Sequence, residues 1–323
     1  MKRLILILSL ILVAQLGLAL ALGLTGNTLD VKSGGPLLKL KTAEIDQVQI
    51  DGPTNQGSIV LKKVDDKWTL PDHFNAPADQ AKVEHLLTTL TDLQRPWPVA
   101  KTADAEKRFK VADADFERRL VFKAGDKDLA TLLLGSSPGF RKVHARVGGE
   151  QQVFDIPFST YQASLKAIDW VDKKPLLVEA DQISAIDLPD CRLTWNEGRP
   201  QLANLAENEQ TKAEPARQLF EKLAELNVLD IYAKAGQPLP NPVDLSIKLE
   251  MKDGKSRQYD FAKGDEAGYA VLQASDAPYL YKVSPTLLKE LQETTRAKLV
   301  QAKPAASAPA ADRKATPTDN PQG

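Results

Sequence analysis

Leu120-Val-Phe-Lys-Ala-Gly125-Asp-Lys-Asp-Leu-Ala-Thr-Leu-Leu-Leu-Gly135 reads as two short strands joined by a turn at Gly125. Leu245-Ser-Ile-Lys-Leu-Glu-Met-Lys-Asp-Gly254-Lys-Ser-Arg-Gln-Tyr-Asp-Phe-Ala-Lys-Gly264 repeats this arrangement in the second half of the chain. Gly125 and Gly135 are ten residues apart, and so are Gly254 and Gly264. Turns such as Ala-Gly-Asp and Asp-Gly-Lys favour a hairpin between alternating segments. The sequence therefore predicts two equivalent β-hairpins.

The segments around each hairpin extend the repeat. Each half reads as strand, strand, helix, four strands and a closing helix. The predicted strands of the first half are Ile45–Asp51, Ser58–Val64, Lys67–Leu70, the Leu120 hairpin, Val143–Val147 and Gln152–Ile156, with helices after Pro77 and at Ser159–Ile168. Those of the second half are Ile183–Leu188, Arg192–Trp195, the Leu245 hairpin, Tyr269–Gln273 and Tyr279–Val283, with helices after Pro215 and at Ser284–Leu299.

This order predicts an α+β fold of two duplicated domains. Short turns join antiparallel strands, so each domain should be a mostly antiparallel sheet with two helices. We place the first domain at residues 40–174 and the second at residues 175–300. If the halves are duplicates, Gly125 and Gly254 should lie in equivalent turns, and Trp68 and Trp195 on equivalent strands.

The N-terminus predicts a membrane anchor. Lys2 and Arg3 precede a run from Leu4 to Leu24 that contains no charged residue. As a helix this run spans roughly 31 Å, which matches the hydrocarbon core of a bilayer. The basic residues favour a cytoplasmic N-terminus. We expect a retained single-pass anchor at residues 1–24 and a linker at residues 25–39. Cleavage of a signal peptide after Ala21 is the alternative, and both place the bulk of the chain outside the cytoplasm.

Composition excludes several classes. The 42 basic and 43 acidic residues give a net charge of −1, whereas nucleic-acid binders usually carry a basic excess on one face. Cys191 is the only cysteine, so neither an internal disulfide nor a cysteine-based metal site is expected. Residues 301–323 are rich in Ala and Pro and predict a disordered tail.

Four segments resemble a known family. They are Lys67-Trp68-Thr69-Leu70, the helix start Ala76-Pro77-Ala78-Asp79, the stretch from Phe116 to Gly135, and Val153-Phe154-Asp155-Ile156. Together they resemble the uncharacterised bacterial domain of unknown function 4340 family over most of Leu40 to Leu299. The resemblance implies an N-terminal membrane segment and genes that often lie beside components of gliding-motility-type ABC transporters. The family has no established catalytic residues, so no residue role is carried over.

Gly135-Ser136-Ser137-Pro138-Gly139 matches the G-x-S-x-G motif of α/β-hydrolases. That motif requires a helix directly after the serine, whereas Phe140–Val147 reads as a strand. The corresponding turn, Gly264-Asp265-Glu266-Ala267-Gly268, keeps the glycine spacing without a serine. Turn geometry therefore explains the glycines, and Ser137 should be dispensable. A hydrolase remains a minor alternative.

No other set of residues predicts chemistry. His73, His85 and His144 lack the spacing of a zinc site, and pairs such as Asp113 with Asp115 and Asp126 with Asp128 suit solvated turns. Trp97 and Trp170 are either core residues or binding anchors. We predict no catalytic, cofactor-binding or metal-binding residue and no cofactor.

The leading hypothesis is a non-enzymatic, membrane-anchored accessory or scaffold protein. It would lie in the bacterial inner membrane with its domains in the periplasm, and its partner would be an ABC transporter permease or another envelope protein. The alternative is an extracytoplasmic module that binds a glycan, lipid or peptide in the groove between the two repeats.

Overall fold

The computed structural model describes Leu12, Gln15 and residues 34–303. The chain divides into two compact units, and the boundary falls between Lys174 and Pro175. The proposed anchor and most of the linker, as well as the tail beyond Lys303, lie outside the described residues. Within the part of the chain that is described, no helix is long and apolar enough to cross a membrane.

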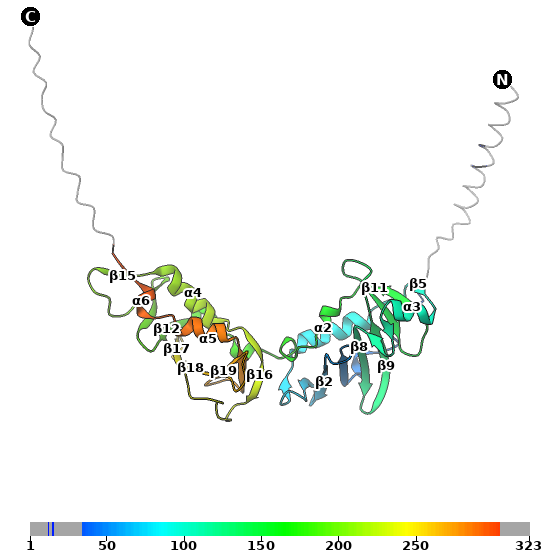
Figure 1. The fold of residues 1–323 in the computed structure, drawn as a ribbon, viewed down its shortest axis with the longest axis horizontal. Coiled ribbons are helices and arrows are strands. Elements are labelled where there is room, and N and C mark those ends of the chain that lie inside the picture. The colour runs from blue at the N-terminus through cyan, green and yellow to red at the C-terminus, as the bar shows by residue number, and fades with distance from the viewer. Residues whose placement is uncertain (1–11, 13–14, 16–33, 304–323) are drawn as a thin grey trace, which may run out of the picture. The chain divides into compact units, whose positions relative to one another are not determined.

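Unit 1 is built on one antiparallel sheet (Figure 1). From edge to edge its strands are β4 (Ala76–Pro77), β3 (Lys67–Leu70), β2 (Ser58–Val64), β1 (Gln47–Asp51), β8 (Arg118–Ala124), β9 (Lys127–Leu134), β10 (Val143–Val147), β11 (Val153–Ile156) and β5 (Pro98–Ala100). The sheet is thus two meanders joined between β1 and β8, where Ile50 lies opposite Leu120.

Alternation of apolar residues gives this sheet its buried face. Val48 and Ile50 of β1 are buried, as are Leu120 and Phe122 of β8, while the residues between them are less buried. Successive side chains of a strand point to opposite faces, so these four residues share one face. The helix α2 (Gln80–Thr91) covers a buried face with Val83, Leu86, Leu87 and Leu90.

The segment that contains α2 carries the chain from one edge of the sheet to the other. The strand β4 lies at one edge, α2 follows it, and β5 lies at the other edge beside β11. Asp79 caps the helix, because its carboxylate accepts a hydrogen bond of 3.1 Å from the backbone N–H of Lys82.

A second, smaller cluster lies around β9 and β11. Val111, Leu133 and Val153 are buried together, with Phe109 and Phe116 packed against them. Phe109, Val111 and Phe116 come from the segment that contains α3 (Ala103–Arg108), β6 (Val111–Ala112) and β7 (Asp115–Phe116), whereas the other two lie on the sheet. This end of the sheet is therefore buried on both faces.

Unit 2 is also built on one antiparallel sheet. Its strands are β14 (Arg199–Leu202), β13 (Arg192–Asn196), β12 (Ile183–Asp187), β17 (Leu245–Met251), β18 (Ser256–Lys263), β19 (Ala270–Ala274), β20 (Tyr279–Val283) and β16 (Val228–Lys234). Its helices are α4 (Ala213–Ala224), α5 (Pro285–Gln292) and α6 (Arg296–Leu299), and β15 (Glu209–Thr211) pairs with β21 (Val300–Ala302).

Apart from the short edge strand β4 of unit 1, the two sheets have the same strand order. If β12, β13 and β14 are matched to β1, β2 and β3, then β17 to β20 match β8 to β11, and β16 takes the place of β5 at the far edge. In each unit a helix of twelve residues, α2 or α4, precedes that edge strand. Gly125 and Gly254 lie in the turns of matching hairpins.

The α+β class and the antiparallel sheets agree with the expectation from sequence. The equivalence of Trp68 and Trp195 is wrong, because Trp68 lies on β3 whereas Trp195 lies on β13, which matches β2. In the strand order the place of β3 is taken by β14, whose sequence Arg-Pro-Gln-Leu has no pattern typical of a strand.

Two predicted closing helices differ from the structure. Ser159–Ile168 forms only the 3-10 turns η2 (Thr160–Gln162) and η3 (Ala167–Asp169). The oxygens of Ser164 accept hydrogen bonds from Lys166 N and Trp170 Nε1 instead of continuing a helix. Ser284–Leu299 divides into α5 and α6, with Ser284 as the N-cap and Pro285 as the first residue of α5.

Candidate functional site

A cleft of about 960 Å³ lies at one end of the unit 1 sheet. Two loops form most of its lining: residues 135–142, which connect β9 to β10, and residues 157–162, which follow β11. Since β9, β10 and β11 are neighbours in the sheet, their connections meet at this place. The cleft therefore brings the G-x-S-x-G stretch together with a segment that the sequence had assigned to a helix.

Gly135 begins the first loop, and only a glycine fits there. A Cβ atom at this position would lie 1.9 Å from the carbonyl oxygen of Phe109. The backbone N–H of Gly135 donates to the carbonyl of His144 at 2.9 Å, and that of Ser136 donates to the carbonyl of Phe109 at 2.9 Å. The loop is thus fastened both to β10 and to the end of α3.

The hydroxyl of Ser137 stabilises the turn. Its Oγ lies 2.7 Å from the carbonyl oxygens of both Gly139 and Lys142, to which the hydroxyl can donate. The residues after Ser137 form a turn and then β10, whereas a nucleophile elbow requires a strand-to-helix turn. The G-x-S-x-G spacing at this position therefore does not build the geometry of that motif.

Ser136, His144 and Asp155 form a polar cluster that sequence spacing did not show. His144 and Asp155 lie opposite each other on β10 and β11. Nδ1 of His144 lies 2.7 Å from the carbonyl oxygen of Ser136 and 3.3 Å from its Oγ, and the ring stacks on Phe109 at 4.1 Å. Alternation along β10 and β11, joined with the expected pairing of these strands, was the signal that could have found His144 and Asp155.

The geometry of this cluster suits a structural role, in which His144 holds the loop at Ser136, better than a catalytic triad. An N–H at Nδ1 of His144 donates to the Ser136 carbonyl, so that nitrogen has no lone pair to accept the proton of the Ser136 hydroxyl. The other ring nitrogen, Nε2, lies 3.5 Å from Oδ1 of Asp155. Within the described residues, that buried oxygen accepts no hydrogen bond.

The rim of the cleft carries exposed aromatic rings and unpaired positive charge. Phe140 is 86% exposed and Tyr161 is 91% exposed. Arg141 lies over the ring of Phe140, 4.9 Å from its centroid. Neither Arg141 nor Lys142 has an ion-pair partner anywhere in residues 34–303. Glu117 also lines the cleft, but it pairs with Lys110 at 2.7 Å and its hydrogen bond raises the pKa of that lysine.

The other residues considered from sequence do not gather into a site. His73 lies in the turn between β3 and β4, and His85 is exposed on α2. Trp170 is buried and donates from Nε1 to the Ser164 carbonyl at 2.9 Å, whereas Trp97 is 68% exposed. Among the described residues no group of three or more His, Cys, Asp and Glu side chains is arranged to hold a metal ion.

Two of the carboxylates considered from sequence, Asp113 and Asp128, form ion pairs, and Cys191 lies beside Asp190. Asp113 pairs with the buried Arg146, and Asp128 pairs with Lys123 at 2.9 Å. Cys191 is half-buried, and burial, followed by the charge of Asp190, raises the pKa of its thiol to about 12. None of these groups faces the cleft.

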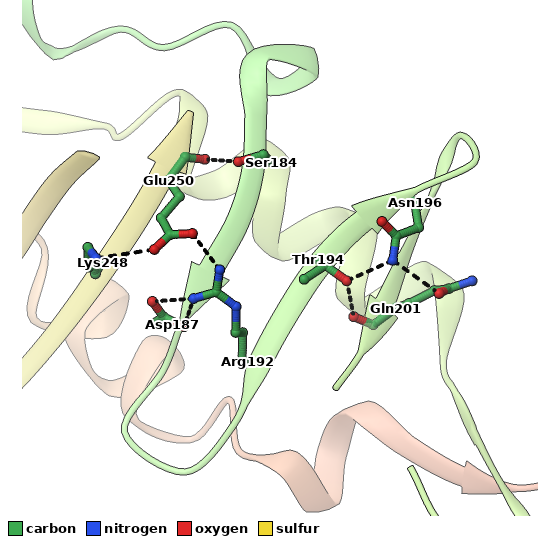
Figure 2. Close-up of polar contacts among 8 residues, drawn as sticks. All are labelled: Ser184, Asp187, Arg192, Thr194, Asn196, Gln201, Lys248 and Glu250. Atoms are coloured by element: carbon green, nitrogen blue, oxygen red, sulfur yellow. Dashed lines mark hydrogen bonds and ion pairs between the residues drawn. The ribbon is translucent and has the colours of Figure 1, made fainter. Parts of the chain in front are cut away.

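The strands β12, β13 and β17 of unit 2 carry a group of charged side chains that pair with one another (Figure 2). Nη1 of Arg192 lies 2.7 Å from Asp187, and Nη2 pairs with Glu250, which Lys248 also contacts at 3.2 Å. The hydrogen bond from Arg192 is the largest cause that lowers the pKa of Glu250. Because each charge in this group has a partner, no charge among these described residues is left to bind a charged ligand.

Comparison with known proteins identifies the family. No curated protein and no solved structure matches the sequence significantly. The sequence profile of the family described as Domain of unknown function (DUF4340) matches residues 68–246, which is more than half of the chain and includes the cleft. The chain therefore belongs to the family Domain of unknown function (DUF4340).

Proposed function

We propose that this protein is a non-enzymatic accessory or scaffold protein of the bacterial cell envelope, held in the inner membrane by residues 1–24. Its N-terminus is cytoplasmic and its two units are periplasmic or otherwise extracytoplasmic. It works by binding a component of an ABC-type transporter or another envelope machine. The observation that carries the binding role is the cleft of unit 1, with its exposed aromatic rings and unpaired cations.

The anchor is supported by the sequence of the N-terminus. Leu4 to Leu24 contains no charge, and about 20 apolar residues suffice to span a bilayer. Lys2 and Arg3 contribute only about 1 kcal/mol each near an anionic surface, so attachment depends on the apolar run. N-terminal sequencing of the native protein tests this proposal. A start at Leu22 would exclude a retained anchor, whereas a start near Met1 in the membrane fraction supports it.

We also propose that the two units are duplicates of one ancestral domain. The identical order of eight strands supports this proposal, as does the helix that precedes the edge strand in each unit. A duplicated binding domain can keep one copy for a partner while the other diverges. Superposition of the two sheets would test the duplication: strands that match in order but pair in a different register would count against it.

The composition of the cleft favours recognition of a partner. Aromatic residues and arginine are enriched where protein–protein interfaces bind most strongly. Phe140, Tyr161 and Arg141 supply these residue types at one rim. The hydroxyl of Ser137 is occupied by the turn, and Nδ1 of His144 by the Ser136 carbonyl. The exposed aromatic and cationic side chains of the cleft are therefore available to a partner, whereas the hydroxyl of Ser137 and the imidazole of His144 hold the loop in place.

Photo-crosslinking in native membranes tests this function. A photoreactive amino acid at Phe140 should link the full-length protein to an integral membrane component of a transporter or envelope machine. The matched control places the same group at Ala267, which is exposed in the corresponding turn of unit 2. A partner captured only from position 140 supports the proposal. Recovery of the uncrosslinked monomer from both positions would contradict it.

A second candidate is an extracytoplasmic module that binds a glycan, lipid or peptide. The cleft favours this candidate because pockets for small molecules commonly measure about 300–1,000 Å³, and this one measures about 960 Å³. Native mass spectrometry of the detergent-purified full-length protein would detect a retained ligand. A bound mass that is lost in Phe140→Ala would favour this candidate over the scaffold.

A further inference from the structure

The positive charges of the unit 1 cleft are not neutralised by any nearby carboxylate that the structure describes. Arg141 and Lys142 are both exposed and lie next to each other in the loop between β9 and β10. The only carboxylate that lines the cleft within the described chain is Glu117, which is already paired with Lys110. Two cations are thus free to bind an anionic group that comes from another molecule.

The polar side chains of the cleft are largely engaged in holding its loops. The hydroxyl of Ser137 is directed to the carbonyls of Gly139 and Lys142, and that of Ser136 to the carbonyl of Phe109 at 3.3 Å. The side-chain oxygen of Gln162 accepts a hydrogen bond of 3.1 Å from Ser159 N. A sugar would need many such groups for its hydroxyls. What remains free is mainly charge and aromatic surface.

The aromatic rings are placed beside this charge. Phe140 immediately precedes Arg141 and lies below its guanidinium, while Tyr161 comes from the second loop. Rings that are 86% and 91% exposed have almost all of their surface available for contact. Apolar side chains of a ligand can bury against them, and the arginine can bind a carboxylate in bidentate fashion.

We propose that this cleft binds an acidic segment of a partner polypeptide. Carboxylates of the segment pair with Arg141 and Lys142, and its apolar side chains pack on Phe140 and Tyr161. This inference rests on the proposed accessory function, for which it names the chemistry of the partner. The affinity should fall as salt rises, because salt screens exposed charges over a Debye length of about 8 Å at physiological ionic strength, and this length shortens as salt is added.

The corresponding turn of unit 2 provides an internal contrast. It carries Asp265 and Glu266 directly after its first glycine, where unit 1 has Ser136 and Ser137, and residues 264–268 contain no cation. Asp265 accepts hydrogen bonds from the hydroxyls of Tyr269 and, at 3.3 Å, Tyr232. An acidic segment would be repelled there, so the binding is expected in unit 1 alone.

Peptide titration against the detergent-solubilised full-length protein tests the inference. The probe is a fluorescent peptide of alternating glutamate and leucine, and its comparison is the same peptide with glutamine in place of glutamate. We expect the acidic peptide to bind more tightly. The double charge reversal Arg141→Glu with Lys142→Glu should weaken its binding about tenfold or more, since two exposed charge pairs are lost and replaced by repulsion.

The matched control reverses two exposed, unpaired cations elsewhere in unit 1, Lys62→Glu with Lys67→Glu. It should leave the affinity for the acidic peptide nearly unchanged. The milder variant Arg141→Gln with Lys142→Gln serves if the charge reversal lowers the melting temperature. Equal loss in both double reversals would overturn the proposal, because the effect would then come from net charge alone.

Other outcomes separate this inference from the proposed function. Equal binding of the glutamine peptide, or tighter binding of polygalacturonate or of vesicles with anionic lipid, would overturn the acidic-segment proposal. If position 140 still captured an envelope partner in that case, the accessory function would stand. If position 140 captured nothing while the acidic peptide bound as expected, the cleft chemistry would stand and the accessory function would fail.

Discussion

The turn between β9 and β10 in unit 1 and the turn between β18 and β19 in unit 2 occupy the same place in the strand order. Both begin with a glycine whose Cβ would collide with a backbone oxygen, at 1.9 Å for Gly135 and 2.6 Å for Gly264. Beyond that glycine they diverge. The first is longer and ends in Arg141 and Lys142, while the second carries Asp265 and Glu266.

The difference shows which parts of the architecture are constrained. Close approach of backbone to backbone fixes the glycine in both units, whatever the role of the turn. The tip of each turn faces solvent, so its charge and length can change without loss of core packing. A binding role in one unit alone is therefore compatible with one architecture for both.

The largest effect should come from a core residue that belongs to one unit. Phe220 of α4 is fully buried and contacts Trp195, 5.0 Å between ring centroids. We expect Phe220→Ala to lower the free energy of unfolding of unit 2 by about 3–5 kcal/mol. Calorimetry should show a lower transition for unit 2 and an unchanged one for unit 1. A single transition that shifts as a whole would show that the two units do not unfold independently.

The glycine at the start of the unit 1 turn gives the next largest effect. Gly135→Ala should destabilise by about 1–3 kcal/mol, because the backbone at Phe109 and Lys110 must move to admit the methyl group. Gly139→Ala is the matched control, since a Cβ there meets nothing within 4 Å. Urea denaturation measures both variants. Similar losses at both positions would contradict the steric explanation.

Removal of the Ser137 hydroxyl should have a modest effect. Ser137→Ala loses the hydrogen bonds that close the turn, which should cost about 0.5–1.5 kcal/mol of stability. Crosslinking from position 140 and any phenotype of the gene should persist, because unit 2 builds its turn without a serine. A variant with normal melting temperature but lost function would revive the hydrolase alternative.

The ion pairs of Arg192 in unit 2 should contribute less to the free energy of unfolding, and their contribution should depend on pH. Arg192→Ala should cost about 0.2–1 kcal/mol at neutral pH, as exposed pairs do. The pKa of Glu250 is lowered by Arg192 from its ordinary 4.5, so the pair stabilises above that pH and the benefit is lost as pH falls through the lowered pKa. The cost of Arg192→Ala should therefore shrink in acid. Arg199→Ala, an exposed residue on β14, is the control.

For Cys191 we expect no effect on stability and predict only the reactivity of its thiol. A rise of its pKa from 9.0 to about 12 leaves little thiolate at pH 8, a reduction on the order of a thousandfold. Alkylation by iodoacetamide should be slow in the folded protein and fast in urea. Equal rates in both conditions would show that burial does not protect this thiol.

The sequence predicted the interior of each sheet and missed its edges. The strands β8, β17 and β18 alternate in burial, and glycine lies in the turns of both hairpins. Both are local features. The edge strand β5 has only three residues and begins with Pro98, and β16 contains two register shifts that break the two-residue period. The segment after β11 had an apolar pattern typical of a helix, but short-range hydrogen bonds from Lys166 and Trp170 to the oxygens of Ser164 hold it in separate turns.

Sequence by itself therefore determined the class of the fold, the two halves, the hairpin turns and the role of Gly135 in a turn. These depend on residue periodicity and backbone geometry, which act over a few neighbouring positions. Only the tertiary structure placed Ser136 beside His144 and Asp155, and brought Phe140 and Arg141 to one cleft with Tyr161. Such groupings arise because a sheet aligns the ends of strands that are distant in the chain, and no local pattern records which loops will meet there.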